Sequence, residues 1–179
     1  MNEIHTGYVS NRILKIQVGF LLADAAGQSR DVSFDVPQKL RIADDLTVDN
    51  LYGDIHLSRT SRGILLQGEI QTQIEGLCAR CLDATTIDLE VPLEELFVYP
   101  PEPGEESVLA DDGILDIAPL LREEIFLNMP IGALCKSDCA GLCPNCGQNL
   151  NEGPCDCEAE PIDPRFAALK ALKDASLED

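Results

Sequence analysis

Eight cysteines are the residues of this sequence whose type and spacing could do chemistry. Two thiolates separated by two residues can bind one tetrahedral metal ion, and two such pairs are present. In Cys143-Pro144-Asn145-Cys146-Gly147 the glycine also lets the backbone turn back toward the sulfurs. Two pairs and four further cysteines, most of them in a segment with little hydrophobic pattern, predict structural zinc. The predicted ligands are Cys78, Cys81, Cys135, Cys139, Cys143, Cys146, Cys155 and Cys157.

The sequence leaves the division of these ligands open. In one arrangement Cys78 and Cys81 join Cys135 and Cys139, and the last four cysteines form a second, local site. In the other, the first four of the C-terminal cysteines form one site, and the pair at 78 and 81 stays free. We favour the first arrangement because it leaves no thiol unpaired. The predicted cofactor is therefore one or two structural zinc ions.

Redox and catalytic uses of the cysteines are less well supported. A redox pair begins a helix, whose dipole lowers the thiol pKa, whereas Leu82 to Ile87 returns to the alternation of a strand. The spacings also differ from those of ferredoxin iron–sulfur sites. Four sulfurs leave no open position for water, and neither His5 nor His56 is near a cysteine in sequence. A thiol-based redox or metal-responsive sensor is the alternative reading.

Other catalytic constellations are missing from the sequence. It contains no Gly-x-Ser-x-Gly elbow, no P-loop and no dinucleotide fingerprint. Acidic pairs such as Glu94-Glu95 and Glu123-Glu124 are typical of solvated faces rather than of acid/base catalysis. We therefore predict no catalytic residue, no bound organic cofactor and no enzymatic activity.

The elements that must position the cysteines read mainly as β-structure. Short strands with alternating apolar residues are expected at 14–18, 32–36, 46–58, 64–77 and 86–91, with a tight turn at 60–63. No helical pattern separates them, so the strands should be antiparallel. A helix is expected at 116–127, with Asp116 as its N-cap. The predicted fold class is α+β, mainly β: a curled antiparallel sheet or small barrel with a helix and a cysteine-rich zinc-knuckle tail.

Changes in composition suggest where the chain divides. We expect an antiparallel β domain over residues 1–99 and an acidic linker or loop over 100–113. A helix packed on the sheet should occupy 114–131, and the zinc-binding tail 132–179. In that tail Asp163 and Pro164 should begin a short terminal helix.

The charge of the chain restricts its partners. Thirteen basic residues stand against 32 acidic ones, and the formal net charge is −19. Such a surface repels phosphate backbones and attracts basic proteins, so direct RNA binding is disfavoured. No apolar run approaches the roughly 20 residues that span a bilayer. A cytoplasmic protein keeps its thiols reduced, so eight cysteines there point to metal or redox chemistry. We expect a cytoplasmic protein without membrane contact.

Several motifs together resemble the bacterial YceD family. They are Cys78-Ala79-Arg80-Cys81-Leu82, Met129-Pro130-Ile131, the run Cys143 to Asn151, and the run Asp163 to Leu169. The resemblance implies a role in the accumulation of large-subunit ribosomal RNA, and so in ribosome assembly. It also implies a cytoplasmic location in bacteria, with relatives in plastids. Combined with the charge, it suggests a non-catalytic factor that binds a basic ribosomal protein or assembly factor.

Overall fold

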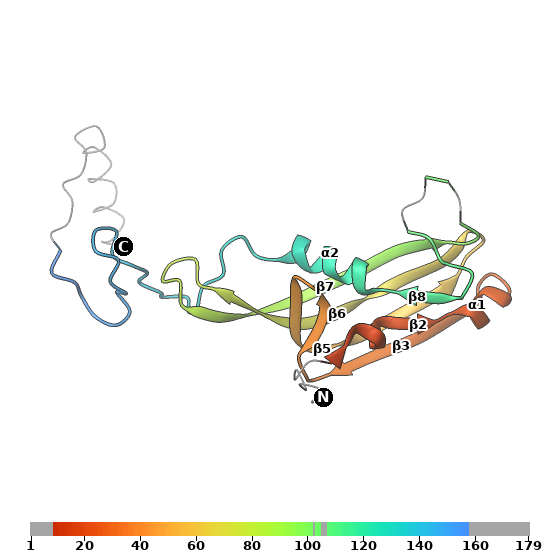
Figure 1. Ribbon diagram of the computed structural model, residues 1–179, viewed down its shortest axis with the longest axis horizontal. Helices are drawn as coiled ribbons and strands as arrows, with labels where there is room; N and C mark the ends of the chain where they lie inside the picture. Colours follow the sequence, from red (N-terminus) through yellow and green to blue (C-terminus); the bar gives the residue numbers. More distant parts are fainter. Residues whose placement is uncertain (1–8, 102, 105–106, 158–179) are drawn as a thin grey trace, which may run out of the picture.

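Long antiparallel strands build the body of the protein (Figure 1). The computed structural model describes residues 9–101, 103–104 and 107–157. Strands β5, β6 and β7 form a meander, and β3 pairs with the other edge of β5. Their bounds are Ser29–Val36 for β3, Leu46–Arg59 for β5, Gly63–Leu77 for β6 and Ala84–Val98 for β7.

Two shorter strands complete the main sheet. Strand β4, Leu40–Ala43, pairs with the first residues of β5, and β1, Val9–Ser10, runs parallel to β4. Within the described residues no pairing joins β7 to β3 or β1, so the sheet is curled but open. The expected mainly β, α+β class with antiparallel pairing is confirmed, and of the two predicted forms the sheet is the open one rather than the small barrel.

The turn between β5 and β6 shows how sequence sets the register. The hydroxyl of Thr60 accepts hydrogen bonds from the backbone N–H groups of Arg62 and Gly63, at 3.2 and 3.1 Å. A Cβ at Gly63 would lie 2.0 Å from the carbonyl oxygen of Phe97, so only glycine fits there. The predicted turn at 60–63 is therefore present, and it starts the in-register pairing of β6 with both neighbours.

A second layer covers one face of this sheet (Figure 1). It consists of helix α2, Ala118–Asn128, together with a two-stranded ribbon of β2, Lys15–Gln17, and β8, Ile114–Asp116. The short helices η1, Asn11–Leu14, and α1, Gly19–Ala23, flank the ribbon. The buried core between the layers is almost entirely Leu, Ile and Val. Fully buried side chains include Leu14, Leu115, Leu121 and Ile125 from the covering layer and Ile55, Leu66, Ile70 and Leu93 from the sheet.

Three local expectations need correction or refinement. The strand expected at 14–18 is only Lys15–Gln17, because η1 and α1 take its ends. Helix α2 starts at Ala118 with Ile117 as its N-cap residue. Asp116 instead ends β8 and accepts a hydrogen bond from the backbone N–H of Ala118 at 3.1 Å. It is also ion-paired with Lys15 at 3.1 Å, so its carboxylate joins the ribbon to the helix start.

The acidic connection after β7 is partly built into the fold. Residues 107–109 run beside the end of β7, where Val98 donates its N–H to Ser107 and accepts one from Leu109. The side chain of Leu109 is buried in the main core. The Pro- and Glu-rich composition indicated an acidic linker or loop and gave no sign of this anchoring. A single buried apolar residue holds the segment on the core.

Strands β6 and β7 extend beyond the rest of the sheet. The pairing of β5 with β6 begins at Asp49 and Gln73, so residues 74–77 of β6 pair only with β7. Figure 1 shows this hairpin reaching away from the sheet, with the cysteine-rich tail at its tip. None of the described helices is long and apolar enough to cross a membrane. The terminal helix expected from Asp163 lies outside the described residues.

A core substitution should test the two-layer arrangement. Ile70 is fully buried at the centre of β6, and we expect Ile70→Ala to lower the free energy of unfolding by about 2–5 kcal/mol. Leu127→Ala on α2 is the control, because that side chain is 77% exposed and its loss should cost less than about 0.5 kcal/mol. Chemical denaturation measures both. Equal costs at the two positions would contradict the packing described.

Candidate metal centres

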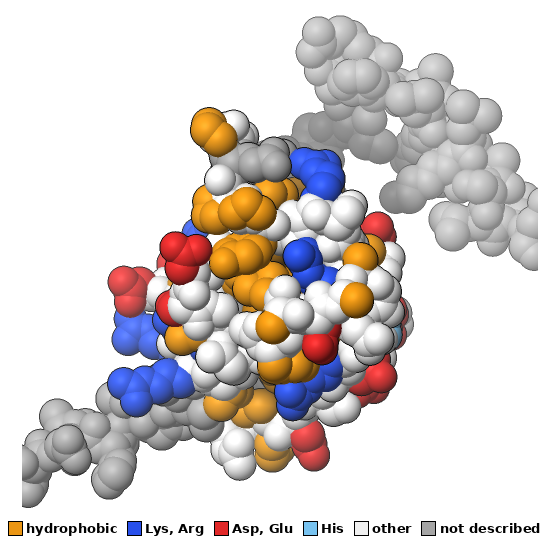
Figure 2. All heavy atoms as spheres, turned by 90° about the vertical axis from the view of Figure 1, so that its right-hand side faces the viewer, with side chains coloured by type: hydrophobic (Ala, Val, Ile, Leu, Met, Phe, Trp, Pro, Cys, Tyr) orange, Lys and Arg blue, Asp and Glu red, His pale blue; other side chains and the backbone are white. Residues whose placement is uncertain are grey.

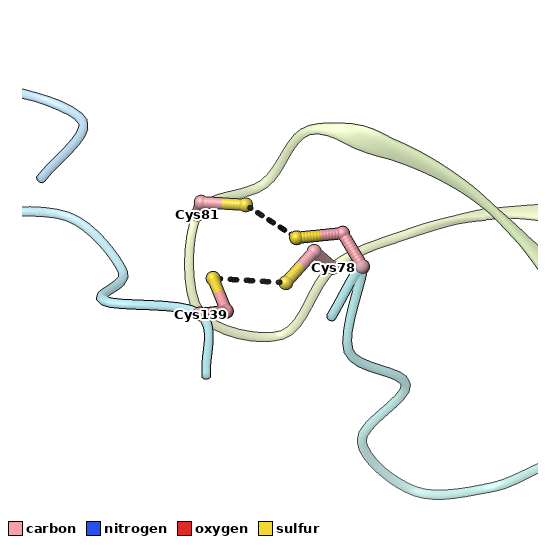
Figure 3. A group of neighbouring side chains, drawn as sticks. Cys78, Cys81 and Cys139 are labelled. Carbon is pink, nitrogen blue, oxygen red and sulfur yellow. Dashed lines mark hydrogen bonds between the residues drawn. The ribbon is translucent and has the colours of Figure 1, made fainter. Parts of the chain in front are cut away.

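The turn at the tip of the β6–β7 hairpin carries the first two cysteines. Cys78 follows β6 directly, and both it and Cys81 are buried. The tail brings Cys139 and Cys135 against them, so that the four sulfurs lie within 4.8 Å of one another. Figure 3 shows Cys78, Cys81 and Cys139 pointing toward one another from the turn and the tail. This set is the first cluster.

The last four cysteines form a second cluster within the tail itself. The sulfurs of Cys143, Cys146, Cys155 and Cys157 also lie within 4.8 Å of one another. Cys143 is buried and Cys146 is exposed, so this cluster is more open to solvent than the first. The structure thus groups the cysteines in the division that the sequence analysis favoured, with one pair contributed by the sheet.

The two Cys-x-x-Cys turns share one backbone geometry. In the first, Cys78 donates its N–H to Asp83 and accepts from Leu82, at 2.9 and 3.0 Å. In the second, Cys143 donates to Gln148 and accepts from Gly147, at 2.8 and 2.9 Å. The residue four positions after the first cysteine has a positive φ in both turns, 62° at Leu82 and 74° at Gly147. Both turns are therefore knuckles that wrap the backbone around one sulfur.

Hydrogen bonds join the tail to the hairpin tip from several directions. Ala79 donates its N–H to the carbonyl of Ala133, and Leu142 donates to the carbonyl of Arg80, at 2.8 and 3.1 Å. The guanidinium of Arg80 donates to the carbonyl of Cys139 at 2.9 Å. Arg80 thus has a defined structural role, because its side chain and its backbone carbonyl both bind the tail.

Two asparagines of the tail, which sequence reasoning did not single out as functional, support the first cluster. The amide of Asn151 donates to the sulfur of Cys139 at 3.4 Å, and its carbonyl accepts from the N–H of Ala140 at 2.9 Å. Asn149 donates its amide to the carboxylate of Asp83 at 2.9 Å, across to the hairpin. The sequence feature that could have identified them is the Asn-x-Asn spacing after the second knuckle. This spacing belongs to a motif on which the family resemblance rests, but the resemblance assigned it no role.

The sulfur separations fit a tetrahedral ion. In a four-sulfur site with zinc–sulfur bonds of about 2.3 Å, neighbouring sulfurs lie about 3.8 Å apart. The Sγ atoms of Cys78 and Cys139 are 3.7 Å apart, and those of Cys81 and Cys135 are 3.5 Å apart. A disulfide would need about 2.05 Å, and all eight cysteines are free. Each cluster is therefore close enough to hold one metal ion.

Backbone N–H groups favour the thiolate at one position in each cluster. They lower the pKa of Cys78 to about 6, with the N–H of Cys81 contributing most. In the same way, chiefly through the N–H of Cys146, they lower the pKa of Cys143 to about 6. The pKa of Cys157 rises to about 12, first because of its hydrogen bond with Cys146. Thiolates so close together repel one another, and a divalent cation would remove that repulsion.

Neither histidine joins a cluster in the part of the chain that the structure describes. His56 lies on β5, where its Nδ1 is 2.6 Å from the carboxylate of Asp31. His5 lies outside the described residues. Each cluster therefore offers sulfur ligands alone.

Comparison with known proteins places these clusters in a family context. A family model described as large ribosomal RNA subunit accumulation protein YceD matches residues 66–173, a range that includes every cysteine. An uncharacterized protein of Mycobacterium tuberculosis is 34% identical over 122 residues, which cover 65% of this chain and 58% of that protein. The chain thus spans less than two thirds of the length of its mycobacterial relatives. No solved structure matches.

Two more distant relatives come from other lineages. A chloroplastic protein of Arabidopsis thaliana, named large ribosomal RNA subunit accumulation protein YCED homolog 1, is 28% identical over 152 residues. These cover 67% of this chain and 47% of the plant protein. The uncharacterized protein YlbN of Bacillus subtilis is 29% identical over 124 residues, or 66% of this chain and 69% of that protein.

The two clusters predict two metal ions per chain, and a mutation in one cluster should remove only the ion of that cluster. We expect native mass spectrometry to find two ions per chain, with a mass that identifies the metal. Cys81→Ser should remove one ion, and Cys146→Ser should remove the other, because the ligand sets share no residue. One ion in the wild type that survives Cys81→Ser would instead support a single site within the tail.

Leu82 provides a test of the knuckle geometry. A left-handed conformation costs a non-glycine residue about 1–2 kcal/mol, and Leu82 is 59% exposed, so its side chain recovers little of this by packing. We expect Leu82→Gly to hold the metal of the first cluster about five- to thirtyfold more tightly than Leu82→Ala, which keeps the strain. Competition with a chelator measures this ratio. A tighter alanine variant would show that the turn is not strained.

Proposed function

The chain belongs to the YceD family of large ribosomal RNA subunit accumulation proteins, and on that premise we propose that it supports assembly of the large ribosomal subunit. The family match over residues 66–173 carries this proposal, because it includes both cysteine clusters and most of the long hairpin. The name of the Arabidopsis relative points to the same process. The chain would act as a zinc-stabilised binding protein in the cytoplasm.

Zinc is the metal that best suits both clusters. Four thiolates in tetrahedral arrangement are the usual ligands of structural zinc, and soft sulfur ligands disfavour magnesium or calcium. The residues that would hold the ions are Cys78, Cys81, Cys135 and Cys139 in the first cluster, and Cys143, Cys146, Cys155 and Cys157 in the second. A site with four protein sulfurs has no free position for substrate or water. We therefore propose a structural role for the ions and a non-catalytic protein.

The charge of the chain supports a protein partner. A molecule of net charge −19 would have to overcome repulsion from the RNA phosphates that come within about a Debye length of it. Ribosomal proteins that bind RNA through Lys and Arg present the opposite charge, and they would be attracted to it over about a Debye length. We propose that a basic ribosomal protein or assembly factor is the direct partner. The effect on ribosomal RNA would then follow from correct assembly.

Deleting the gene in the source organism tests the biological part of this proposal. We expect the ratio of large-subunit to small-subunit ribosomal RNA to fall, and the wild-type gene to restore it. The Cys81→Ser variant should restore it less well, because the tail would lose its attachment to the hairpin. Quantification of both RNAs measures the effect. An unchanged ratio after deletion would contradict a role in large-subunit assembly.

The molecular part is tested with purified components. At physiological salt the protein should bind one or more purified basic ribosomal proteins and not bind ribosomal RNA fragments. The opposite result, tight RNA binding without protein binding, would overturn the proposed partner. Thiol titration adds a check on the sensor alternative: closed zinc sites should react slowly until a chelator is added, whereas a sensor would offer a fast thiol.

A further inference from the structure

The main sheet has one covered face and one uncovered face. Residues of β3, β5, β6 and β7 alternate, and the set that includes Phe34, Ile55, Ile70 and Val91 packs under α2 and the β2–β8 ribbon. The opposite set faces away from this core, and within the described residues no element packs on it. We call this set the open face. Its cross-strand rows include Asp31–His56–Gln67–Glu94, Ser33–Asp54–Glu69–Pro92 and Asp35–Tyr52–Gln71–Glu90.

The open face carries many carboxylates. Most of them are exposed, and they come from all four strands. They are Asp31, Asp35, Asp54, Glu69, Glu75, Asp88, Glu90 and Glu94. No Lys or Arg occupies an open-face position of these strands in the described part of the chain. Lys39, paired with Glu75 and Asp49, is the basic residue at its margin.

These carboxylates are close enough to act together. Neighbouring strands are about 4.8 Å apart, and residues on one face of a strand repeat about every 6.8 Å. Both spacings are shorter than the Debye length of about 8 Å at physiological salt, so the charges repel one another with little screening. A partner that brings several positive charges would remove this repulsion. An RNA would increase it.

An aromatic ring lies among these charges. Tyr52 is 46% exposed, and it borders a shallow hollow of about 340 Å³ that Gln71, Asp88 and Glu90 also line. The carboxylate of Asp88 is fixed there by the amide of Gln73 at 2.6 Å. A ring face beside two carboxylates suits a guanidinium or ammonium group, which can stack on the ring and pair with the acids.

Apart from Lys39 at the margin, the basic side chains that the structure describes lie away from the open face. Arg30 belongs to β3 but faces the covered side, where its guanidinium is 5.1 Å from the ring centre of Phe20 on α1. Arg122 is on α2 and pairs with Asp45. Figure 2 shows the end of the molecule near α1, where Lys and Arg side chains lie among hydrophobic and acidic ones. Positive and negative side chains are thus mixed at that end, whereas the described strands place carboxylates and no Lys or Arg on the open face.

We propose that the open face is the docking surface for an Arg- and Lys-rich segment of a protein partner, with Tyr52 and its hollow as the anchor point. The proposal rests on the function proposed above, since it names the surface through which a basic ribosomal protein would bind. An open, extended face of this kind suits a basic segment lying across the strands, with one Arg or Lys in the hollow and others over the rows of carboxylates.

Charge neutralisation on the open face tests the proposal. The triple variant Asp54→Asn, Glu69→Gln and Glu90→Gln removes carboxylates that make no side-chain hydrogen bond or ion pair within the described residues. We expect it to weaken binding of a labelled deca-arginine peptide at physiological salt by at least about tenfold. Tyr52→Leu, which keeps apolar bulk but removes the ring, should weaken binding about two- to fivefold. Circular dichroism and thermal unfolding check that each variant is folded.

A matched triple separates a specific surface from net charge. Asp111→Asn, Glu123→Gln and Glu124→Gln change the net charge by the same amount away from the open face, and should weaken binding less than about threefold. Equal losses in the two triples would overturn the proposal. The same variants are then assayed with purified basic ribosomal proteins.

The two assays distinguish failure of this inference from failure of the proposed function. Ribosomal protein binding that the open-face triple leaves intact would overturn the docking surface and leave the proposed function standing. Peptide binding through the open face without any ribosomal protein binding would support the surface and contradict the function. An absence of binding to both probes would overturn both.

Discussion

The attachment of the tail to the tip of the β6–β7 hairpin is the constraint on which the rest of the C-terminal structure depends. Residues 132–157 contribute almost nothing to the main hydrophobic core, whose last members among the described residues are Ile125 and the adjoining Met129. Their order comes from the first cluster and from the hydrogen bonds around it, including that of Arg80 to the carbonyl of Cys139. A segment without a core of its own needs such a link, and a metal ion held by the first cluster would supply it most directly.

The hairpin makes this attachment geometrically available. Because β6 and β7 run past the end of β5, their turn stands clear of the sheet, and its two sulfurs can be approached by a distant part of the chain. The second cluster then needs no help from the sheet, since its knuckle is closed by its own backbone bonds. The two clusters repeat one knuckle geometry, but one joins the tail to the sheet and the other organises the tail itself.

The sheet separates two further tasks. Its covered face holds the molecule together through Leu, Ile and Val packed under α2 and the β2–β8 ribbon. Its open face has no such duty, and eight carboxylates lie on it with no Lys or Arg from these strands among the described residues. This division follows from the strict alternation of side chains along a strand, which places every second residue on each face. The hairpin belongs to both tasks, since it carries the first cluster at its tip and acidic residues along its length.

The sequence by itself determined the mainly β class, the turn at 60–63 and the two Cys-x-x-Cys knuckles, because each depends on local spacing: alternation for strands, Gly63 for the turn, two-residue gaps for the knuckles. The motifs also sufficed for the family. Only the tertiary structure decided that Cys78 and Cys81 meet Cys135 and Cys139, that Leu82 takes the conformation that Gly147 takes in the second knuckle, and that Asn151 supports a sulfur. It alone gathered the carboxylates of separate strands onto one face. These features join residues far apart in the chain, and their proximity is set by strand register and packing, which no local pattern encodes.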